Sequence, residues 1–178
     1  DDRDRNDDQC KLQRLDHRTG ESRAINVWPV DNMGAGAEAA KYRFQWNYPI
    51  FFSPNNPKKL YAAGNHLFAT EDEGKTWQMI SPDLTTSDTA KLKQNRTGGL
   101  TYDITGAEMH CTIIAITPSP LQKGEIWAGT DDGLIHLTTD GGSKVNFCNA
   151  LRAAGAIVEH IFVIFFYGIY PNSEKILS

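Results

Sequence analysis

The chain has no excess of positive charge: 18 lysines and arginines stand against 22 aspartates and glutamates, for a formal net charge of −4. Nucleic acid and anionic membrane surfaces are therefore not expected as partners, because both are bound through clustered basic side chains. The cysteines number three and show no C-x-x-C spacing, so neither a closed disulfide framework nor a zinc site is indicated. The sequence predicts no metal and no cofactor.

Recognisable catalytic motifs are also missing, since the chain contains no H-E-x-x-H, no G-x-S-x-G and no phosphate-binding loop. The strongly apolar residues 161–170 are fewer than the ~20 that a membrane span needs. With 178 residues, 40% of them apolar, the composition is that of an ordinary soluble protein, either one domain or part of a larger one.

The most informative stretch reads Thr-Glu-Asp-Glu-Gly-Lys-Thr-Trp and begins at Thr70. Asp72 can accept hydrogen bonds from nearby backbone N–H groups, and Gly74 can take the positive φ of a compact turn. Thr76 suits a strand end, and Trp77 offers a large apolar surface to bury. The stretch predicts a tight hairpin turn with an aromatic anchor, which is a structural role.

The pattern around this turn occurs twice. Residues 59–63 and 66–70 read as strands, and residues 125–129 and 134–138 repeat them in the same order. Earlier in the chain, residues 12–28 read as a hairpin whose second strand holds Ile25, Val27 and Trp28, and the alternation of residues 42–46 predicts a further strand. The second turn keeps the corresponding structural residues Thr138, Asp140 and Gly142, and has Lys144 and Val145 where the first has Thr76 and Trp77.

The spacing S/T-x-D-x-G-x-T-W resembles the Asp-box of BNR-repeat β-propellers. Residues from about 16 to 145 look like BNR/YVTN-type propeller proteins that are labelled glycosyl hydrolases and are related in architecture to the sortilin-type propeller. The segments YRFQWNYPIFFSP, TEDEGKTWQMISPDLT, TGAEMHCTI and IWAGTDDGLIHLTTDGG carry the likeness. It implies an all-β fragment, a partial β-propeller of about two four-stranded antiparallel blades plus the end of a preceding blade. It also implies an extracellular or periplasmic location, although the chain shows no signal peptide.

The chain is expected to divide into six segments, and the blade pattern stops after Val145. We interpret the residues beyond that point as an out-of-frame or truncated end. The segments are a disordered charged tail over 1–11, the end of a preceding blade and a connection over 12–40, a blade with a full Asp-box over 41–84, an inter-blade loop over 85–109, a blade with a degenerate Asp-box over 110–148, and an atypical apolar tail over 149–178.

The resemblance places the functional side on the face opposite the Asp-box turns, where loops often carry function. A glycosidase needs two carboxyl groups about 5 to 9.5 Å apart. Glu108 with Asp103 or Asp131 could form such a catalytic pair, although an Asp-Asp-Gly run is also what a hairpin turn uses. The binding candidates on this face are Asn65, His66, His110, Asp131 and Asp132.

Two functions are compatible with this interpretation. The first is an exported recognition scaffold that binds a protein or a carbohydrate ligand. The alternative is a carbohydrate-active hydrolase, which rests on the family label and on the Asp103 and Glu108 string. A chain of open blades would also expose unpaired strand edges, so self-association is a further expectation.

Overall fold

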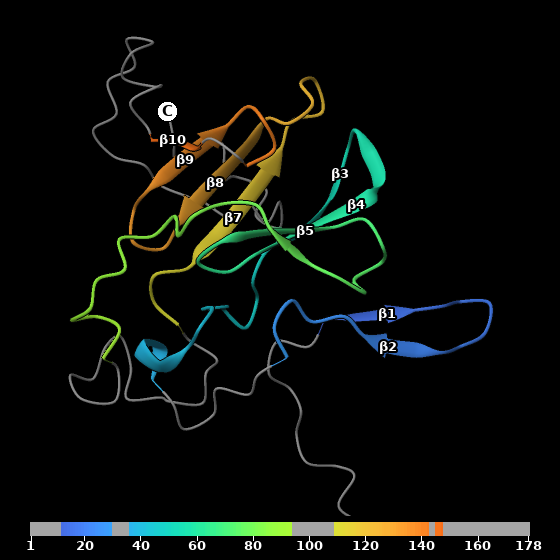
Figure 1. Ribbon diagram of the computed structural model, residues 1–178, viewed down its shortest axis with the longest axis horizontal. Helices are drawn as coiled ribbons and strands as arrows, with labels where there is room; N and C mark the ends of the chain where they lie inside the picture. The colour runs from blue at the N-terminus through green and yellow to red at the C-terminus, as the bar shows by residue number, and fades with distance from the viewer. Residues whose placement is uncertain (1–11, 30–35, 94–108, 143–144, 148–178) are drawn as a thin grey trace, which may run out of the picture.

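The described part of the chain is built from β-strands, as predicted. The computed structural model describes residues 12–29, 36–93, 109–142 and 145–147 (Figure 1). One short 3-10 helix, Ala37–Ala39, accompanies the strands. The strands are β1 (Gln13–Leu15), β2 (Ser22–Ala24), β3 (Ile50–Ser53), β4 (Asn56–Ala63), β5 (Leu67–Thr70), β6 (Gln78–Met79), β7 (Ile113–Pro118), β8 (Ile126–Thr130), β9 (Ile135–Thr138) and β10 (Val145–Phe147).

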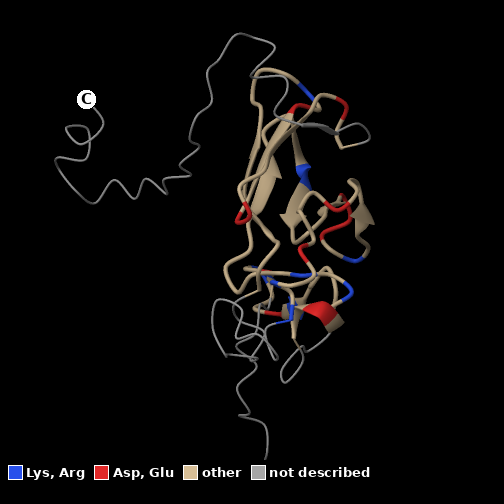
Figure 2. Cartoon of the chain, turned by 90° about the vertical axis from the view of Figure 1, so that its left-hand side faces the viewer, with Lys and Arg blue, Asp and Glu red and all other residues tan. Residues whose placement is uncertain are grey.

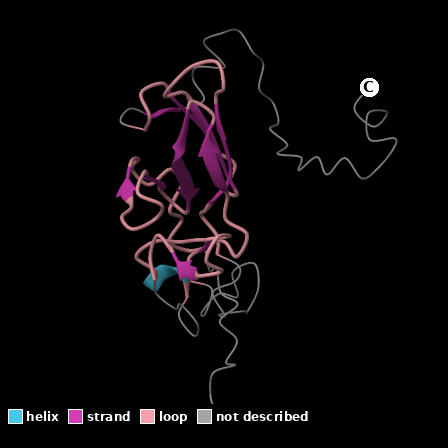
Figure 3. Ribbon diagram, turned by 90° about the vertical axis from the view of Figure 1, so that its right-hand side faces the viewer, coloured by secondary structure: helices cyan, strands magenta, loops and turns pink. Residues whose placement is uncertain are grey.

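The strands form three antiparallel sheets in which neighbours in sequence are neighbours in space. The first four-stranded sheet has the order β3-β4-β5-β6, the second has the order β10-β9-β8-β7, and β1 pairs with β2 in a separate ribbon. Figure 3 shows the strands linked by loops at both ends of the sheets. The described sheets do not close into a ring, so the all-β class is shown and a propeller is not.

The two four-stranded sheets share one register, which is the repeat expected from the sequence. Leu60 on β4 faces Thr70, and Ile126 on β8 faces Thr138. On the other side of each strand, Phe52 faces Leu60 and Pro118 faces Ile126. Leu60 and Ile126 therefore hold equivalent positions in the two sheets.

The main core lies between these two sheets. Side chains on one face of β4 and β5 pack against side chains of β7 and β8, because alternate residues of a strand point to the same face. Removal of this apolar surface from water is the main favourable term in their association. The buried members are Tyr61, Ala63, Leu67, Ala69, Leu84, Ile113, Ile116, Ile126 and Ala128, with Ile80 partly buried against them.

The turn after β5 is closed by its own side chains. The Thr70 hydroxyl donates to Asp72 Oδ1 at 2.7 Å and accepts from the Gly74 N–H at 3.0 Å. Asp72 also accepts from the backbone N–H of Thr76 at 2.9 Å and from its hydroxyl at 2.7 Å. The backbone and hydroxyl bonds from Thr76 and the hydroxyl bond from Thr70 hold the pKa of the Asp72 carboxyl well below its usual range.

The turn after β9 repeats part of this arrangement. The Thr138 hydroxyl donates to Asp140 Oδ1 at 2.9 Å and accepts from the Gly142 N–H at 2.9 Å. In both turns the glycine has a positive φ, +76° at Gly74 and +115° at Gly142. A side chain at either glycine would be strained, because L-residues rarely adopt that backbone conformation.

The β1–β2 ribbon has a backbone hydrogen bond that matches one at the end of the β5–β6 pair, the last two strands of the first four-stranded sheet. The Ile25 N–H donates to the Leu12 carbonyl at 2.9 Å, and the Ile80 N–H donates to the Leu67 carbonyl at 2.8 Å. The two pairs are separated by the same number of residues along the chain. The Trp77 Nε1–H donates to the Ile25 carbonyl at 3.0 Å and fastens the ribbon to the sheet.

Two strand predictions are wrong: one strand does not form, and the other lies at different residues. Residues 42–46 form no strand, because side chains satisfy this backbone instead: the Arg43 N–H donates to Asn65 Oδ1 at 3.0 Å. The second strand of the first hairpin was expected at Ile25–Trp28, but β2 ends at Ala24 and Ile25 is buried below the ribbon instead. The turn between β1 and β2 is closed by the Gly20 N–H, which donates to the Asp16 carbonyl at 2.7 Å.

The ends of the chain and part of the middle segment lie outside the described residues. The expected charged tail over 1–11 and the apolar tail over 149–178 are both among them. Within the described part, no helix has the length and apolar character to cross a membrane. Figure 2 shows acidic and basic residues interspersed along this part.

Candidate functional site

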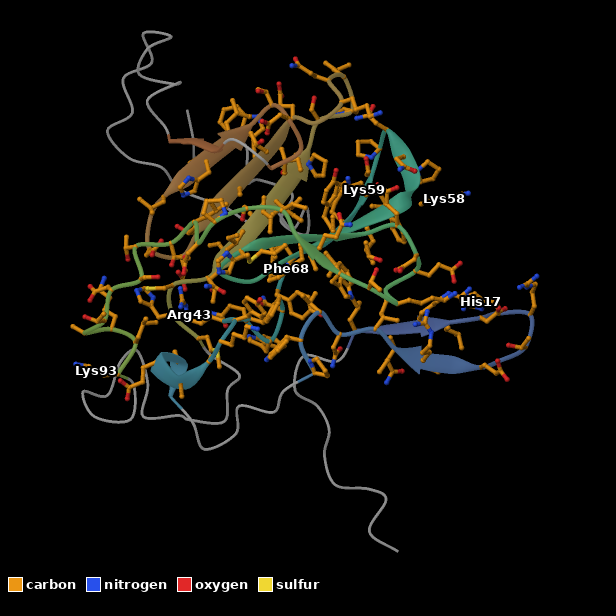
Figure 4. The ribbon with its side chains drawn as sticks, in the orientation of Figure 1. His17, Arg43, Lys58, Lys59, Phe68 and Lys93 are labelled. Atoms are coloured by element: carbon orange, nitrogen blue, oxygen red, sulfur yellow. The ribbon has the colours of Figure 1, made fainter. Side chains whose placement is uncertain are left out.

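Five connecting segments meet at one end of the two four-stranded sheets, which we call the loop end. It consists of residues 42–47, 64–66, 81–88, 109–112 and 131–133, and hydrogen bonds join these segments to one another. Figure 4 shows Arg43 at this end and Lys58 far from it. The segments that enter β3 and β7 therefore lie beside the loops that come after β4, β6 and β8.

Arg43 is the central residue of the loop end and is only 6% exposed. Its Nε–H donates to the Cys111 carbonyl at 3.0 Å, and its Nη2 lies 2.8 Å from Asp83 Oδ2. The same Nη2 donates to the hydroxyls of Thr85 at 3.0 Å and Ser87 at 3.1 Å. One buried guanidinium thus ties the segment before β3 to the loop after β6 and to the segment before β7.

Asp83 is the anionic partner of this group. Burial alone would raise the pKa of its carboxyl, but hydrogen bonds from Asn65, Thr85 and Ser87 outweigh burial and lower the pKa well below its ordinary value. The Asn65 Nδ2–H donates to Asp83 Oδ2 at 2.8 Å, and the Thr85 N–H donates to Asp83 Oδ1 at 2.9 Å. Asp83 is therefore ionised at neutral pH.

This lowered pKa predicts how Asp83 contributes to stability as pH changes. A carboxyl with a depressed pKa in the folded state stabilises it above the unfolded pKa, and this contribution is lost as pH falls through the folded pKa. We expect the Asp83→Asn variant to be less stable than wild type at neutral pH, and the difference to shrink between about pH 5 and pH 2. Urea unfolding across this range measures it; a difference that stays constant would contradict the assignment.

Asn65 and Asp131 have matching positions in the two sheets. Asn65 Oδ1 accepts from the Arg43 N–H at 3.0 Å, and Asp131 Oδ1 accepts from the Thr112 N–H at 2.9 Å. In each sheet the loop after the second strand thereby holds the segment that enters the first strand. Both side chains anchor backbone at this end, Asn65 as a buried residue and Asp131 as a half-buried one.

His110 is the unusual member of the loop end, because it is 7% exposed and neither ring nitrogen has a hydrogen-bond partner among the residues that the structure describes. Its Nδ1 lies 3.5 Å from Asp131 Oδ2. Burial raises the pKa of the Asp131 carboxyl, against the lowering effect of the bonds from Thr112 and of the neighbouring His110 ring. A half-buried acid and a buried imidazole are thus placed side by side.

Asp132 joins the two sheets at this end. It accepts from the Thr86 N–H at 2.6 Å, from the Thr86 hydroxyl at 2.8 Å and from the hydroxyl of Thr130. Burial would raise the pKa of Asp132, but the bonds from Thr130 and Thr86 lower it overall. Its carboxylate is occupied by these three donors.

The structure brings all five binding candidates, Asn65, His66, His110, Asp131 and Asp132, to the loop end, and His66 contacts other segments of it. Its Nδ1 lies 3.1 Å from the Ser81 carbonyl oxygen, and its ring packs edge-on against Tyr42 at 5.7 Å. The catalytic candidates Asp103 and Glu108 lie outside the described residues. Within the described ranges no cluster of three His, Cys, Asp or Glu side chains could hold a metal ion.

Sequence reasoning missed Arg43, Asp83 and Cys111. The run from Asp83 to Ser87, an acid followed by hydroxyl residues two and four positions later, is the same signal that marks an Asx turn and could have indicated Asp83. Cys111 is fully buried with a positive φ of 59°, and burial raises the pKa of its thiol. A buried, protonated thiol is a poor nucleophile, so Cys111 fits a packing role.

Comparison with known proteins gives only short similarities. No family model matches the chain. Orotate phosphoribosyltransferase from Dinoroseobacter shibae is 55% identical over 42 residues, which is 24% of this chain and 19% of that protein. The enzymes of the same name from Rhizobium rhizogenes and Cereibacter sphaeroides are 55% identical over 38 residues and 57% identical over 37 residues, each 21% of this chain and 16% of the relative. The chain thus spans about a fifth or less of the curated relatives it matches.

These comparisons overturn the resemblance stated from the sequence. The assignment to the sortilin-like BNR/Asp-box group labelled glycosyl hydrolases is wrong, because no family model matches and the similarities lead to orotate phosphoribosyltransferases instead. The physical reason is that the Thr-x-Asp turn is held by hydrogen bonds among a few consecutive residues, so its presence does not identify a family. The turn after β8 uses it as well: the Thr130 hydroxyl bonds to Asp132 and accepts from the Leu134 N–H at 3.0 Å.

Proposed function

We propose that this chain is a recognition scaffold that binds a protein or a carbohydrate ligand at the loop end. The observation that carries the proposal is Trp46, a large aromatic residue that is 63% exposed. It comes directly after Gln45, whose Nε2–H donates to the Met109 carbonyl at 2.8 Å. Exposed aromatic rings on a fixed backbone supply contact area to sugars and to protein partners at low entropic cost.

The polar network of the loop end supports this proposal, because a recognition surface benefits from residues that are already held in place. Arg43 fixes the backbone before Trp46, and Asp132 fixes the neighbouring loop through Thr86. Asp83, Asp131 and Asp132 each accept at least two hydrogen bonds. Such carboxylates suit a rigid scaffold better than a freely titrating acid and base pair.

The same proposal includes the way in which the three sheets are arranged. The common register of the two four-stranded sheets and the matching bonds of Ile25 and Ile80 support two blades of a partial β-propeller, with β1 and β2 as the end of a preceding blade. In such an arrangement the loop end would be one face of the assembly. A hydrolase remains the alternative, and it would need Asp103 and Glu108.

Replacement of Trp46 by alanine tests the binding surface. We expect the wild-type chain to bind a member of a panel of glycans and folded proteins, and Trp46→Ala to weaken that binding by about tenfold or more, since central aromatic anchors dominate interfaces. The matched control is Leu121→Ala, because Leu121 is 96% exposed and lies in the β7–β8 connection at the opposite end. Calorimetric titration measures both variants.

Equal binding by wild type and Trp46→Ala would show that the loop end is not the recognition surface. Turnover of chromogenic glycosides by the wild-type chain would favour the hydrolase instead. Orotate belongs in the same panel, because the segment of up to 42 residues shared with orotate phosphoribosyltransferases favours phosphoribosyl transfer as a second candidate. Consumption of orotate in the presence of a phosphoribosyl donor would replace the scaffold proposal.

A further inference from the structure

A cavity of about 450 Å³ lies between the β1–β2 ribbon and the first four-stranded sheet. Figure 1 shows the ribbon alongside this sheet. One wall comes from the ribbon through Arg14 and Ile25, and the opposite wall comes from β3, β4 and the turn after β5. The sheet side is lined by Phe52, Pro57, Lys58, Leu60, Glu71 and Glu73. We call this space the ribbon groove.

The equivalent space on the second sheet is filled. Leu60, which lines the ribbon groove, holds the position that Ile126 holds in the second sheet. Ile126 packs into the core with Tyr61 and Ala63 of β4. Leu60 and Ile25 are themselves buried, at 8% and 6% exposure, whereas Phe52 beside them is 62% exposed, so the open apolar surface of the ribbon groove is that of Phe52.

The ribbon corresponds only to the last two strands of a four-stranded sheet. The bond from the Ile25 N–H to the Leu12 carbonyl matches the bond from Ile80 to Leu67, so β1 corresponds to β5 and β2 to β6. β5 has β4 on one side and β6 on the other, whereas β1 pairs with β2 and with no second strand among the described residues. Within the part of the chain that the structure describes, one edge of β1 therefore lacks the neighbour that β5 has.

The direction of the backbone groups of β1 agrees with an open edge. In an antiparallel pair, hydrogen-bonded positions alternate with positions whose N–H and C=O point away. Since the Leu12 carbonyl bonds toward β2, the N–H groups of Gln13 and Leu15 point to the other edge. An added strand would find these donors directed toward it.

The geometry points to a β-hairpin of another polypeptide segment, with the pattern of β3–β4, as the occupant of the ribbon groove. Its second strand pairs with the edge of β1 that has no partner among the described residues, and its apolar side chains pack against the exposed ring of Phe52, in the way that Tyr61 and Ala63 pack against the second sheet. This continues the sheet-to-sheet contact already present in the chain. It concerns a surface away from the loop end and does not depend on the function proposed there.

A synthetic peptide copying residues 49–64 of this chain is the probe. We expect the labelled peptide to bind the full chain, as read by fluorescence anisotropy, and a control peptide with Tyr61→Glu not to bind. Phe52→Glu in the chain should weaken binding about tenfold or more, because Phe52 lines the ribbon groove and is 62% exposed. Phe51→Glu is the matched control, since Phe51 is 45% exposed on the adjacent position and does not line the groove.

Hydrogen exchange distinguishes strand addition at β1 from adsorption of the peptide elsewhere on the chain. Peptide binding should slow exchange at the N–H groups of Gln13 and Leu15, which pair with the added strand. No binding, equal loss with Phe51→Glu and Phe52→Glu, or unchanged exchange at β1 would each overturn the proposal. Dimers of the chain that dissociate in Phe52→Glu, without any peptide binding, would assign the groove to a second copy and overturn it as well.

Discussion

Replacing Arg43 by alanine is expected to lower the free energy of unfolding by about 3 kcal/mol, because removal of one partner leaves the other members of a buried ionic network uncompensated. Arg43 is 6% exposed, and it bonds to Asp83, Thr85, Ser87 and the Cys111 carbonyl. The loss should exceed that of an ordinary hydrogen bond, which contributes about 1 kcal/mol. Equilibrium unfolding in urea measures the change.

A surface arginine in an ion pair provides the control for this prediction. Arg18 lies 3.3 Å from Asp16, but its side chain is 87% exposed. Arg18→Ala should cost about 0.5 kcal/mol or less, since water and salt screen exposed pairs. Arg43→Lys should fall between the two, because an ammonium keeps the charge but loses the planar donors of the guanidinium. Equal effects of Arg43→Ala and Arg18→Ala would show that the loop end does not depend on Arg43.

The strands and their turns could be predicted from the sequence because their signals are local. Thr70, Asp72 and Gly74 specify a turn within five residues, and the repeat of the flanking strands identifies two similar sheets. The strand predicted at residues 42–46 failed for a non-local reason. Its backbone bonds to Asn65, a side chain 22 positions away, instead of to a neighbouring strand.

The centre of the loop end could not be predicted because it depends on contacts between distant segments. Arg43 meets the Cys111 carbonyl 68 positions later in the chain, and nothing near Arg43 in sequence indicates that its guanidinium is buried. Asn65, His110, Asp131 and Asp132 were selected because they lie just after or just before strands at one end of each sheet. Their grouping follows from the topology of the sheets, whereas the hydrogen-bond partner of each side chain does not.

The family resemblance failed because the motif describes a turn and not a whole protein. Three turns of this chain, at Thr70, Thr130 and Thr138, place a threonine hydroxyl on an aspartate two residues later. A hydrogen-bond pattern that recurs so readily within one chain can arise in unrelated β-proteins. The short similarities to orotate phosphoribosyltransferases, in turn, give no information about the three sheets.

Four glycine variants test whether the ribbon and the two sheets are successive copies of one unit. A methyl group at Gly74 would come within 2.6 Å of the Ile25 Cβ, and one at Gly142 would overlap the Ile80 carbonyl oxygen. Gly20 and Gly133 also have positive φ, but a methyl group there meets nothing within 4 Å. The four positions therefore separate backbone strain from contact with the preceding unit.

The free energy of unfolding of these four alanine variants is the most direct measurement. Gly20→Ala and Gly133→Ala should each cost about 1 kcal/mol, the penalty of a left-handed conformation for an L-residue. Gly74→Ala and Gly142→Ala should each cost about 3 kcal/mol, because overpacking against Ile25 and Ile80 adds to that strain. A loss at Gly142 without a matching loss at Gly74, or four equal losses, would contradict the claim that the ribbon is packed as a copy of the same unit.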